Sequence, residues 1–88
     1  MHVILRGIDR AAVFFEDDDR QFFLDHLVAV AAEESVAVHA YVLMTNHLHL
    51  LMTAARDDGV SAVMKRVGQR DVQHVNRTYG RTGGLFEG

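Results

Sequence analysis

The chain contains no cysteine and no proline. Without cysteine, neither a disulfide scaffold nor a cysteine-based zinc site can form. No apolar run approaches the roughly 20 residues that a membrane-spanning helix needs. The N-terminus also lacks the apolar core and small-residue cleavage site of a signal peptide. We therefore expect a cytoplasmic protein with no membrane partner.

The 88 residues suffice for one small domain, because a chain of this length cannot bury two separate hydrophobic cores. Apolar residues make up 49% of the chain and charged residues 24%. That balance is typical of a globular domain and argues against disorder. We therefore treat residues 1–88 as a single domain.

The net charge of −3 hides an asymmetry between two parts of the chain. Residues 16–34 carry seven acidic side chains and one basic side chain, whereas residues 60–86 carry five basic and one acidic. One half of the molecule is therefore suited to face a polyanion while the other half faces solvent. Charge runs are usually only solvated surfaces, so this pattern alone favours nucleic-acid binding weakly.

The hydrophobic pattern predicts five elements. Short β-branched and aliphatic stretches predict strands at residues 2–7, 36–44 and 47–53. Apolar residues at helical spacing predict one helix that starts at Asp17 or Asp18 and runs to Glu34, and a second from Asp57 or Asp58 to near Gly80. The order strand-helix-strand-strand-helix predicts an α+β, ferredoxin-like antiparallel sheet without a clear last strand.

The last two predicted strands are separated only by Thr45 and Asn46, which predicts a tight hairpin, and Asn46 is able to take positive φ. Because strand side chains alternate between faces, Leu48, Leu50 and Met52 are expected to pack against the helices. Tyr41 and Leu43 are expected to share that packed face.

His47 and His49 are the most informative pair in the sequence. Separated by one residue on a strand, they point to the same face with backbones about 7 Å apart. Both imidazoles can then reach one divalent ion with bonds of about 2.1 Å. Two histidines are too few for a closed structural site, so the pair suits an open, catalytic one. The alternative is that both are half-exposed histidines without a ligand.

The other histidines are assigned structural or surface roles. His26 is expected on the polar side of the first helix, His39 on the strand face that meets the helices, and His74 on the second helix. His2 lies near the N-terminus and gains interest only if it approaches the pair.

The second predicted helix carries a basic and amide-rich face, a composition that suits phosphate and base-edge contacts. A plainly solvated helix is the alternative. Arg6 and Arg10 flank Gly7 in the first loop and add two candidate phosphate contacts. The full set of candidate DNA-binding residues is Arg6, Arg10, Lys65, Arg66, Gln69, Arg70, Gln73, Asn76, Arg77 and Arg81.

Four stretches together resemble a known family. They are HVILRGIDRAAVFFEDDDRQFFL, HAYVLMTNHLHLLM, VMKRVGQRDVQHVNRTYGRTG and GLFEG, and they cover nearly the whole chain. This sequence is similar to the single-tyrosine transposases with the HUH motif, which are IS200-like mobile-element proteins. The REP-associated tyrosine transposase branch is the most similar, and LMTNHLHLLM carries the most specific match.

The resemblance implies a ferredoxin-like fold and a DNA transposase that cleaves and rejoins single-stranded DNA. His47 and His49 would then hold a divalent metal, Mg or Mn, which polarises the scissile phosphate. A tyrosine would attack it and form a transient 5′-phosphotyrosine link. The family's targets are often DNA hairpins, and its members are commonly dimers.

The sequence departs from the family pattern at its end. The family's nucleophilic tyrosine and third metal ligand lie on a helix after the segment that matches GLFEG, so we expect the nucleophile beyond Gly88. Tyr41 is expected in the core, and Tyr79 is only a weak fallback catalyst. Thr45 replaces a usual proline, and Asp71 replaces a common aromatic and places an acid in the basic helix.

We therefore expect a partial transposase domain whose last strand and catalytic helix are missing, and which is inactive alone. Its exposed sheet edge favours a homodimer, with exchange of elements between copies as one form. The alternative is a nonenzymatic remnant that binds nucleic acid or only self-associates. The sequence leaves open whether the chain acts as an enzyme.

Overall fold

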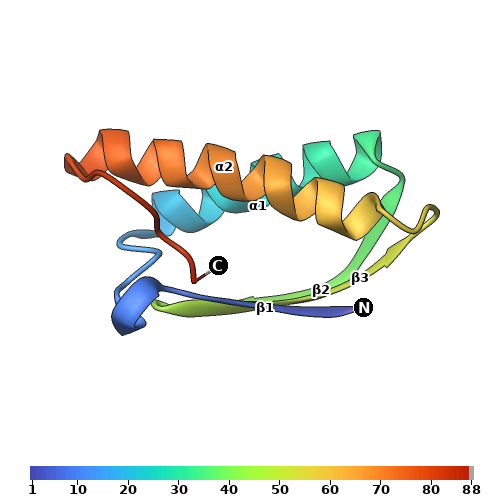
Figure 1. Ribbon diagram of the computed structural model, residues 1–88, viewed down its shortest axis with the longest axis horizontal. Helices are drawn as coiled ribbons and strands as arrows, with labels where there is room; N and C mark the ends of the chain where they lie inside the picture. Colours follow the sequence, from blue (N-terminus) through green and yellow to red (C-terminus); the bar gives the residue numbers. More distant parts are fainter. Residues whose placement is uncertain (88) are drawn as a thin grey trace.

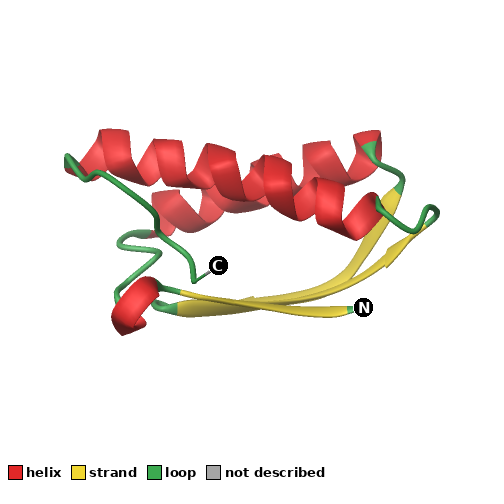
Figure 2. Cartoon of the chain, in the orientation of Figure 1, coloured by secondary structure: helices red, strands yellow, loops and turns green. Residues whose placement is uncertain are grey.

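A three-stranded antiparallel sheet supports two helices in the computed structural model, which describes residues 1–87 (Figure 1). Strands β1 (His2–Arg6), β2 (Val36–Leu43) and β3 (His47–Ala54) lie in the order β1-β3-β2. Helices α1 (Asp17–Glu33) and α2 (Gly59–Tyr79) form one layer over the same face of the sheet (Figure 2). The expected α+β class and element order are confirmed.

The hydrophobic core lies between the sheet and this helical layer. On β3, Leu48, Leu50 and Met52 are all fully buried, as the alternation predicts. They meet side chains of both helices, among them Phe23 and Leu27 of α1 and Val63, Val67 and Val75 of α2. The intervening β3 residues therefore face away from the helices. No helix within residues 1–87 has the length and apolarity to cross a membrane.

The N-cap residue of helix α1 lies earlier in the chain than expected. It is Glu16, rather than Asp17 or Asp18, and it forms a reciprocal capping box with Asp19. The Asp19 carboxylate accepts the backbone N–H groups of Phe15 and Glu16, each at 2.9 Å. Asp19 thus satisfies amide groups that the helix itself cannot bond.

The β2–β3 hairpin turns at Thr45 and Asn46, and the Met44 N–H donates to the His47 carbonyl at 2.9 Å. Asn46 does not take the positive φ that its residue type allows. Within residues 1–87, the only non-glycine residues with positive φ are Asp9, Arg10 and Ser35. The turn is held from outside instead. The Thr45 carbonyl accepts two backbone N–H groups, those of Val13 and Phe14, and the Asn46 carbonyl accepts that of Gly7.

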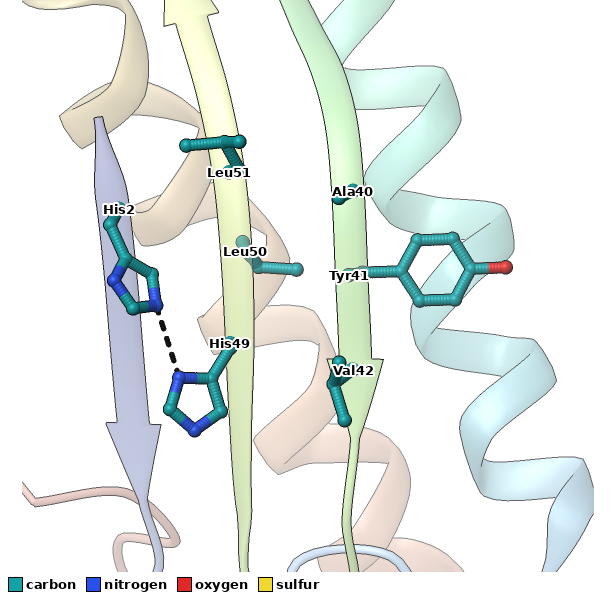
Figure 3. A pocket seen from close by; sticks show the side chains of 7 residues that line it. All are labelled: His2, Ala40, Tyr41, Val42, His49, Leu50 and Leu51. Atoms are coloured by element: carbon teal, nitrogen blue, oxygen red, sulfur yellow. Dashed lines mark hydrogen bonds between the residues drawn. The ribbon is translucent and has the colours of Figure 1, made fainter.

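Two expectations for β2 are wrong, and a register shift between Val38 and Ala40 explains the first. His39 lies at this irregularity and faces away from the helices, where its Nε2 lies 2.9 Å from Thr53 Oγ1. Tyr41 pairs with Leu50 and so shares its face, but β2 is an edge strand. The Tyr41 ring extends past that edge and is 52% exposed rather than part of the core (Figure 3).

The C-terminal segment returns from the end of α2 to the sheet (Figure 1). Gly80 ends the helix in the left-handed conformation, with φ of 64°. Leu85 is buried, and its carbonyl accepts the Ile8 N–H, while the Glu87 N–H donates to the Arg6 carbonyl. A single β-bridge pairs Gly7 with Phe86. Gly88 lies outside the described residues.

Candidate metal centre and nucleic-acid interface

His47 and His49 project from the central strand toward the same, helix-free face of the sheet. Their ring centroids lie 5.3 Å apart, and the ring planes are nearly perpendicular at 78°. The pairing of β1 with β3 places Arg6 beside His47 and Ile4 beside His49. The i, i+2 spacing therefore brings the two imidazoles together, as the sequence predicts.

Hydrogen bonds to the Nδ1 atoms orient both rings. His47 Nδ1 lies 2.8 Å from Asn46 Oδ1, which can only accept a hydrogen bond. Where Nδ1 donates in this contact, Nε2 is the ring nitrogen that points to a ligand. His49 Nδ1 lies 3.0 Å from His2 Nε2 (Figure 3). With the proton of that bond on His49, its Nε2 is also free to bind a metal.

An open hollow of about 510 Å³ lies in front of the pair, between the end of β1 and the hairpin turn. It is lined by Arg6, Gly7, Arg10, Asn46, His47, His49 and Glu87. Within residues 1–87, neither arginine forms an ion pair with a carboxylate. The hollow therefore combines two imidazole rings with two guanidinium groups that have no acidic partner, a composition suited to a cation together with an anion.

Glu87 is the residue of this hollow that the sequence analysis missed. The Gly7–Phe86 bridge and the hydrogen bond from the Glu87 N–H to the Arg6 carbonyl place Glu87 across from Arg6. Arg6 is in turn paired with His47. No local motif signals this register, because it depends on how the segment after α2 returns to β1.

The donor set fits a divalent cation only in part. Two imidazole nitrogens on one face suit a divalent first-row transition metal, whereas Mn²⁺ needs oxygen ligands in addition. Within residues 1–87, however, no three histidine, aspartate or glutamate side chains lie close enough together to hold a metal ion. His47 and His49 can therefore supply two ligands, and water or a phosphate oxygen must supply the others.

An apolar hollow of about 270 Å³ adjoins this site on the same sheet and shares His49 with it (Figure 3). Val42 and Leu51 line it and are about half exposed. His2 stacks against His49 at its border, with ring centroids 5.2 Å apart. The polar hollow and the apolar surface are thus continuous across β3.

The predicted DNA-binding residues divide between two sides of the molecule. Arg6 and Arg10 lie at the histidine pair, whereas the candidates of α2 belong to the helical layer on the other face of the sheet. Arg66 is paired with Glu33 at 3.0 Å. Asn76 donates to the Gly83 carbonyl and accepts from Arg81, so this pair fixes the returning segment. The structure does not bring all ten residues into one surface.

Tyr79 lies on the helical side, where its hydroxyl donates to Asp19 Oδ2 at 2.5 Å. This hydrogen bond, with burial and nearby carboxylates, raises the pKa of Tyr79 to about 12. Burial alone would raise the pKa of Asp19. The hydrogen bonds from Tyr79, the Glu16 and Phe15 amides and His74 outweigh it and hold that pKa below its usual value. Tyr79 is thus a proton donor and a poor source of phenolate.

Asp71, the acid within the basic helix, is buried. Only 1% of the residue is exposed, and within residues 1–87 neither carboxylate oxygen has a hydrogen-bond partner. Burial, and secondarily repulsion from Asp19, raises the pKa of Asp71 to about 7. The helical stripe of Val63, Val67 and Val75 passes through this position, so packing geometry overrides side-chain polarity here.

These observations define a ferredoxin-like domain that presents an open histidine pair beside free guanidinium groups. A scan against protein families matches residues 1–86 to the family described as transposase IS200 like. The chain therefore belongs to the IS200-like transposase family, and it is a transposase domain. No curated protein matched the sequence in a separate search.

Proposed function

We propose that this domain binds single-stranded DNA at the hollow and presents one phosphodiester to a divalent cation held by His47 and His49. The observation that carries the proposal is that two imidazoles and two unpaired arginines line the same hollow. Mn²⁺ and Mg²⁺ both prefer oxygen ligands, so we propose that water and the DNA phosphate complete the coordination that the two imidazoles begin. The family match supports interaction with DNA.

Each residue of the hollow has a distinct part in this proposal. His47 and His49 bind the cation through Nε2, and Asn46 and His2 hold their rings in place. Arg6 and Arg10 donate to the non-bridging phosphate oxygens and offset their charge. When bound, the cation supplies Lewis-acid polarisation of the phosphate.

Cleavage and rejoining through a phosphotyrosine also require a nucleophile. The tyrosine oxygen bonds to phosphorus as the 3′ oxygen leaves with the electron pair of its bond, and rejoining reverses this exchange. Tyr41 extends from the β2 edge, and Tyr79 is bonded to Asp19 on the helical side. Tyr41 lines only the adjoining apolar hollow, and neither tyrosine lines the hollow at the histidine pair. We therefore propose that a tyrosine outside residues 1–87 performs the attack.

A homodimer is the second part of the proposal. Within residues 1–87, the outer edge of β2 pairs with no other strand, and Tyr41 and Val42 beside it are 52% and 53% exposed. An exposed strand edge with apolar side chains favours pairing with another copy, including a form that exchanges elements.

A hairpin is the DNA substrate that we propose, with its unpaired bases at the hollow.

The alternative function is binding without cleavage, as a nonenzymatic remnant. One observation favours it. Within residues 1–87, no tyrosine lines the hollow at the histidine pair, and no third side chain lies close enough to complete a metal site with His47 and His49. Incubation of the chain with labelled single-stranded DNA and Mn²⁺ separates the two functions. A covalent protein–DNA adduct supports the enzyme, and binding without an adduct supports the remnant.

Fluorescence anisotropy tests the metal-dependent binding directly. A labelled single-stranded oligonucleotide is titrated with the chain in Mn²⁺ or in EDTA. We expect Mn²⁺ to tighten binding about tenfold, and His47→Ala or His49→Ala to remove that gain. His39→Ala is the matched control, because His39 lies on the same sheet face outside the hollow. An equal response of all the variants to Mn²⁺ would contradict the proposal.

A further inference from the structure

A groove runs between α1 and α2 on the face of the molecule opposite the histidine pair. It consists of two hollows of about 400 Å³ and 170 Å³ that share Arg70 and Gln73. Because the two hollows share these side chains, they form one continuous groove. Figure 1 shows α1 and α2 on one face of the sheet. His47 and His49 of β3 point toward the other face, so the sheet lies between this groove and the hollow at the histidine pair.

Three rings of the groove form a stack. Phe22 lies between His26, with centroids 4.3 Å apart, and His74, at 3.9 Å with planes inclined by 12°. His26 Nδ1 lies 3.1 Å from the Phe22 carbonyl, and His74 Nε2 lies 3.1 Å from Asp19 Oδ1. The histidine rings are thus held in place before any ligand arrives, and each half-buried ring leaves part of its surface in the groove.

Two cations flank the stack. Arg70 and Arg77 lie seven residues apart on α2, which places them about 10 Å apart along the helix axis. Both are exposed, and within residues 1–87 neither forms an ion pair with a carboxylate. Arg66, by contrast, is neutralised by Glu33, the acidic residue that lines the groove. The amide of Gln73 lies between the two free guanidinium groups.

We propose that this groove is a second binding surface for single-stranded DNA, separate from the cation site. Arg70 and Arg77 contact phosphates, Gln73 contacts base edges, and one or two bases stack on the outer faces of the His26 and His74 rings, which enclose Phe22 between them. Stacking on aromatic rings next to a cationic path is how proteins hold single strands with little dependence on sequence. This proposal rests on the proposed function, because it concerns the same substrate class.

The groove would hold a segment remote from the phosphate at the histidine pair. One strand can occupy both surfaces only by passing around the domain, so the two surfaces are expected to contribute independently to affinity. Loss of the groove should therefore weaken DNA binding and leave the Mn²⁺ response intact. Loss of the histidine pair should remove the Mn²⁺ response and leave the affinity in EDTA intact.

The test compares Arg70→Ala/Arg77→Ala with Arg56→Ala, which removes a charge from the loop before α2, outside the groove. Anisotropy with a labelled 30-nucleotide single strand is measured over a range of salt concentrations. We expect about a tenfold loss of affinity in the double variant, and a salt slope smaller by about 1.4 for two lost phosphate contacts. Arg56→Ala should change neither quantity by a similar amount.

A second measurement locates the bases. A strand with photoreactive 5-bromouracil is cross-linked to the unmodified chain, and the linked peptides are identified by mass spectrometry. Cross-links to Phe22, His26 or His74 support the proposal. Cross-links confined to β1 and β3, with unchanged affinity in Arg70→Ala/Arg77→Ala, overturn it and leave the proposed function standing. No single-strand binding by the unmodified chain overturns both.

Discussion

The Tyr79 hydroxyl donates a hydrogen bond of 2.5 Å to the Asp19 carboxylate, which lies 60 residues earlier in the chain. This contact joins the last residue of α2 to the first turn of α1. The same carboxylate accepts the amides of Phe15 and Glu16 and lies 3.1 Å from His74 Nε2. Asp19 is therefore a structural hub that couples the two helices, and Tyr79 belongs to that hub.

Replacement of Tyr79 by phenylalanine tests this assignment. Because the ring remains and only the hydroxyl is lost, we expect a lower melting temperature with an unchanged Mn²⁺-dependent DNA affinity. Thermal denaturation followed by circular dichroism, together with anisotropy, measures both. Loss of a protein–DNA adduct in a Tyr79→Phe variant that keeps its melting temperature would instead make Tyr79 the nucleophile.

Asp71 should make the stability of the domain depend on pH. Its pKa of about 7 in the folded chain exceeds the ordinary value of 3.8, so the folded state binds the proton more tightly than the unfolded state does. The free energy of unfolding should therefore fall as the pH rises from about 4 to about 7, by at most about 4 kcal/mol. Urea denaturation at several pH values in this window measures the change.

Two variants isolate the contribution of Asp71. Asp71→Leu places an apolar side chain among Val67 and Val75, and we expect higher stability at pH 7 with a weaker pH dependence. Asp57→Asn, at an exposed position before α2, is the control and should keep the pH dependence of the unmodified chain. An identical pH profile for Asp71→Leu and the unmodified chain would refute the role of Asp71.

Much of this architecture follows from the sequence, and the exceptions have identifiable causes. The alternation of Leu48, Leu50 and Met52 places the histidines on one face, because the side-chain period of a strand is two. Residues 40–44 are apolar throughout, so no alternation of polar and apolar side chains shows which of them face the core. The sequence therefore could not reveal the irregularity at His39 or the exposure of Tyr41. Long-range pairing decided these positions.

The sequence carries a signal for the burial of Asp71 and none for the place of Glu87. The spacing of Asp71 from Val67 and Val75 puts it on the buried stripe of α2, although a charged side chain is rarely buried. For Glu87 there was no local signal. Its place in the hollow depends on the pairing of Gly7 with Phe86, almost a full chain length away.

Gly7 should be essential for the shape of the hollow. A Cβ atom there would lie 2.1 Å from the Ala11 carbonyl oxygen, so the turn that carries Arg10 would have to move. We expect Gly7→Ala to lower the free energy of unfolding by about 1–3 kcal/mol and to weaken Mn²⁺ binding. Urea denaturation and calorimetric titration measure these effects.

Gly68 provides the matched control for that substitution. Its position in α2 has no atom within 4 Å of a built Cβ, so Gly68→Ala should raise the free energy of unfolding by about 1 kcal/mol. Equal effects of the two alanine substitutions would show that the close approach at Gly7 does not constrain the turn.

The β2 edge should carry the self-association of the domain. Tyr41→Lys adds a charge to this edge, and we expect it to shift the chain from dimer to monomer in sedimentation velocity. Val28→Lys, on an exposed position of α1 away from the sheet, is the control and should leave the dimer intact. A dimer that persists in Tyr41→Lys would place the interface elsewhere.

The most direct measurement of the cation site uses the six histidines as reporters. Substoichiometric Mn²⁺ is added to the chain, and paramagnetic broadening of the histidine ring signals is followed by NMR. The proposed site predicts that His47 and His49 broaden first, with His2 close behind, while His26 and His74 on the helical side stay sharp. Broadening that begins at His26 or His74, or that affects all six rings alike, would contradict it.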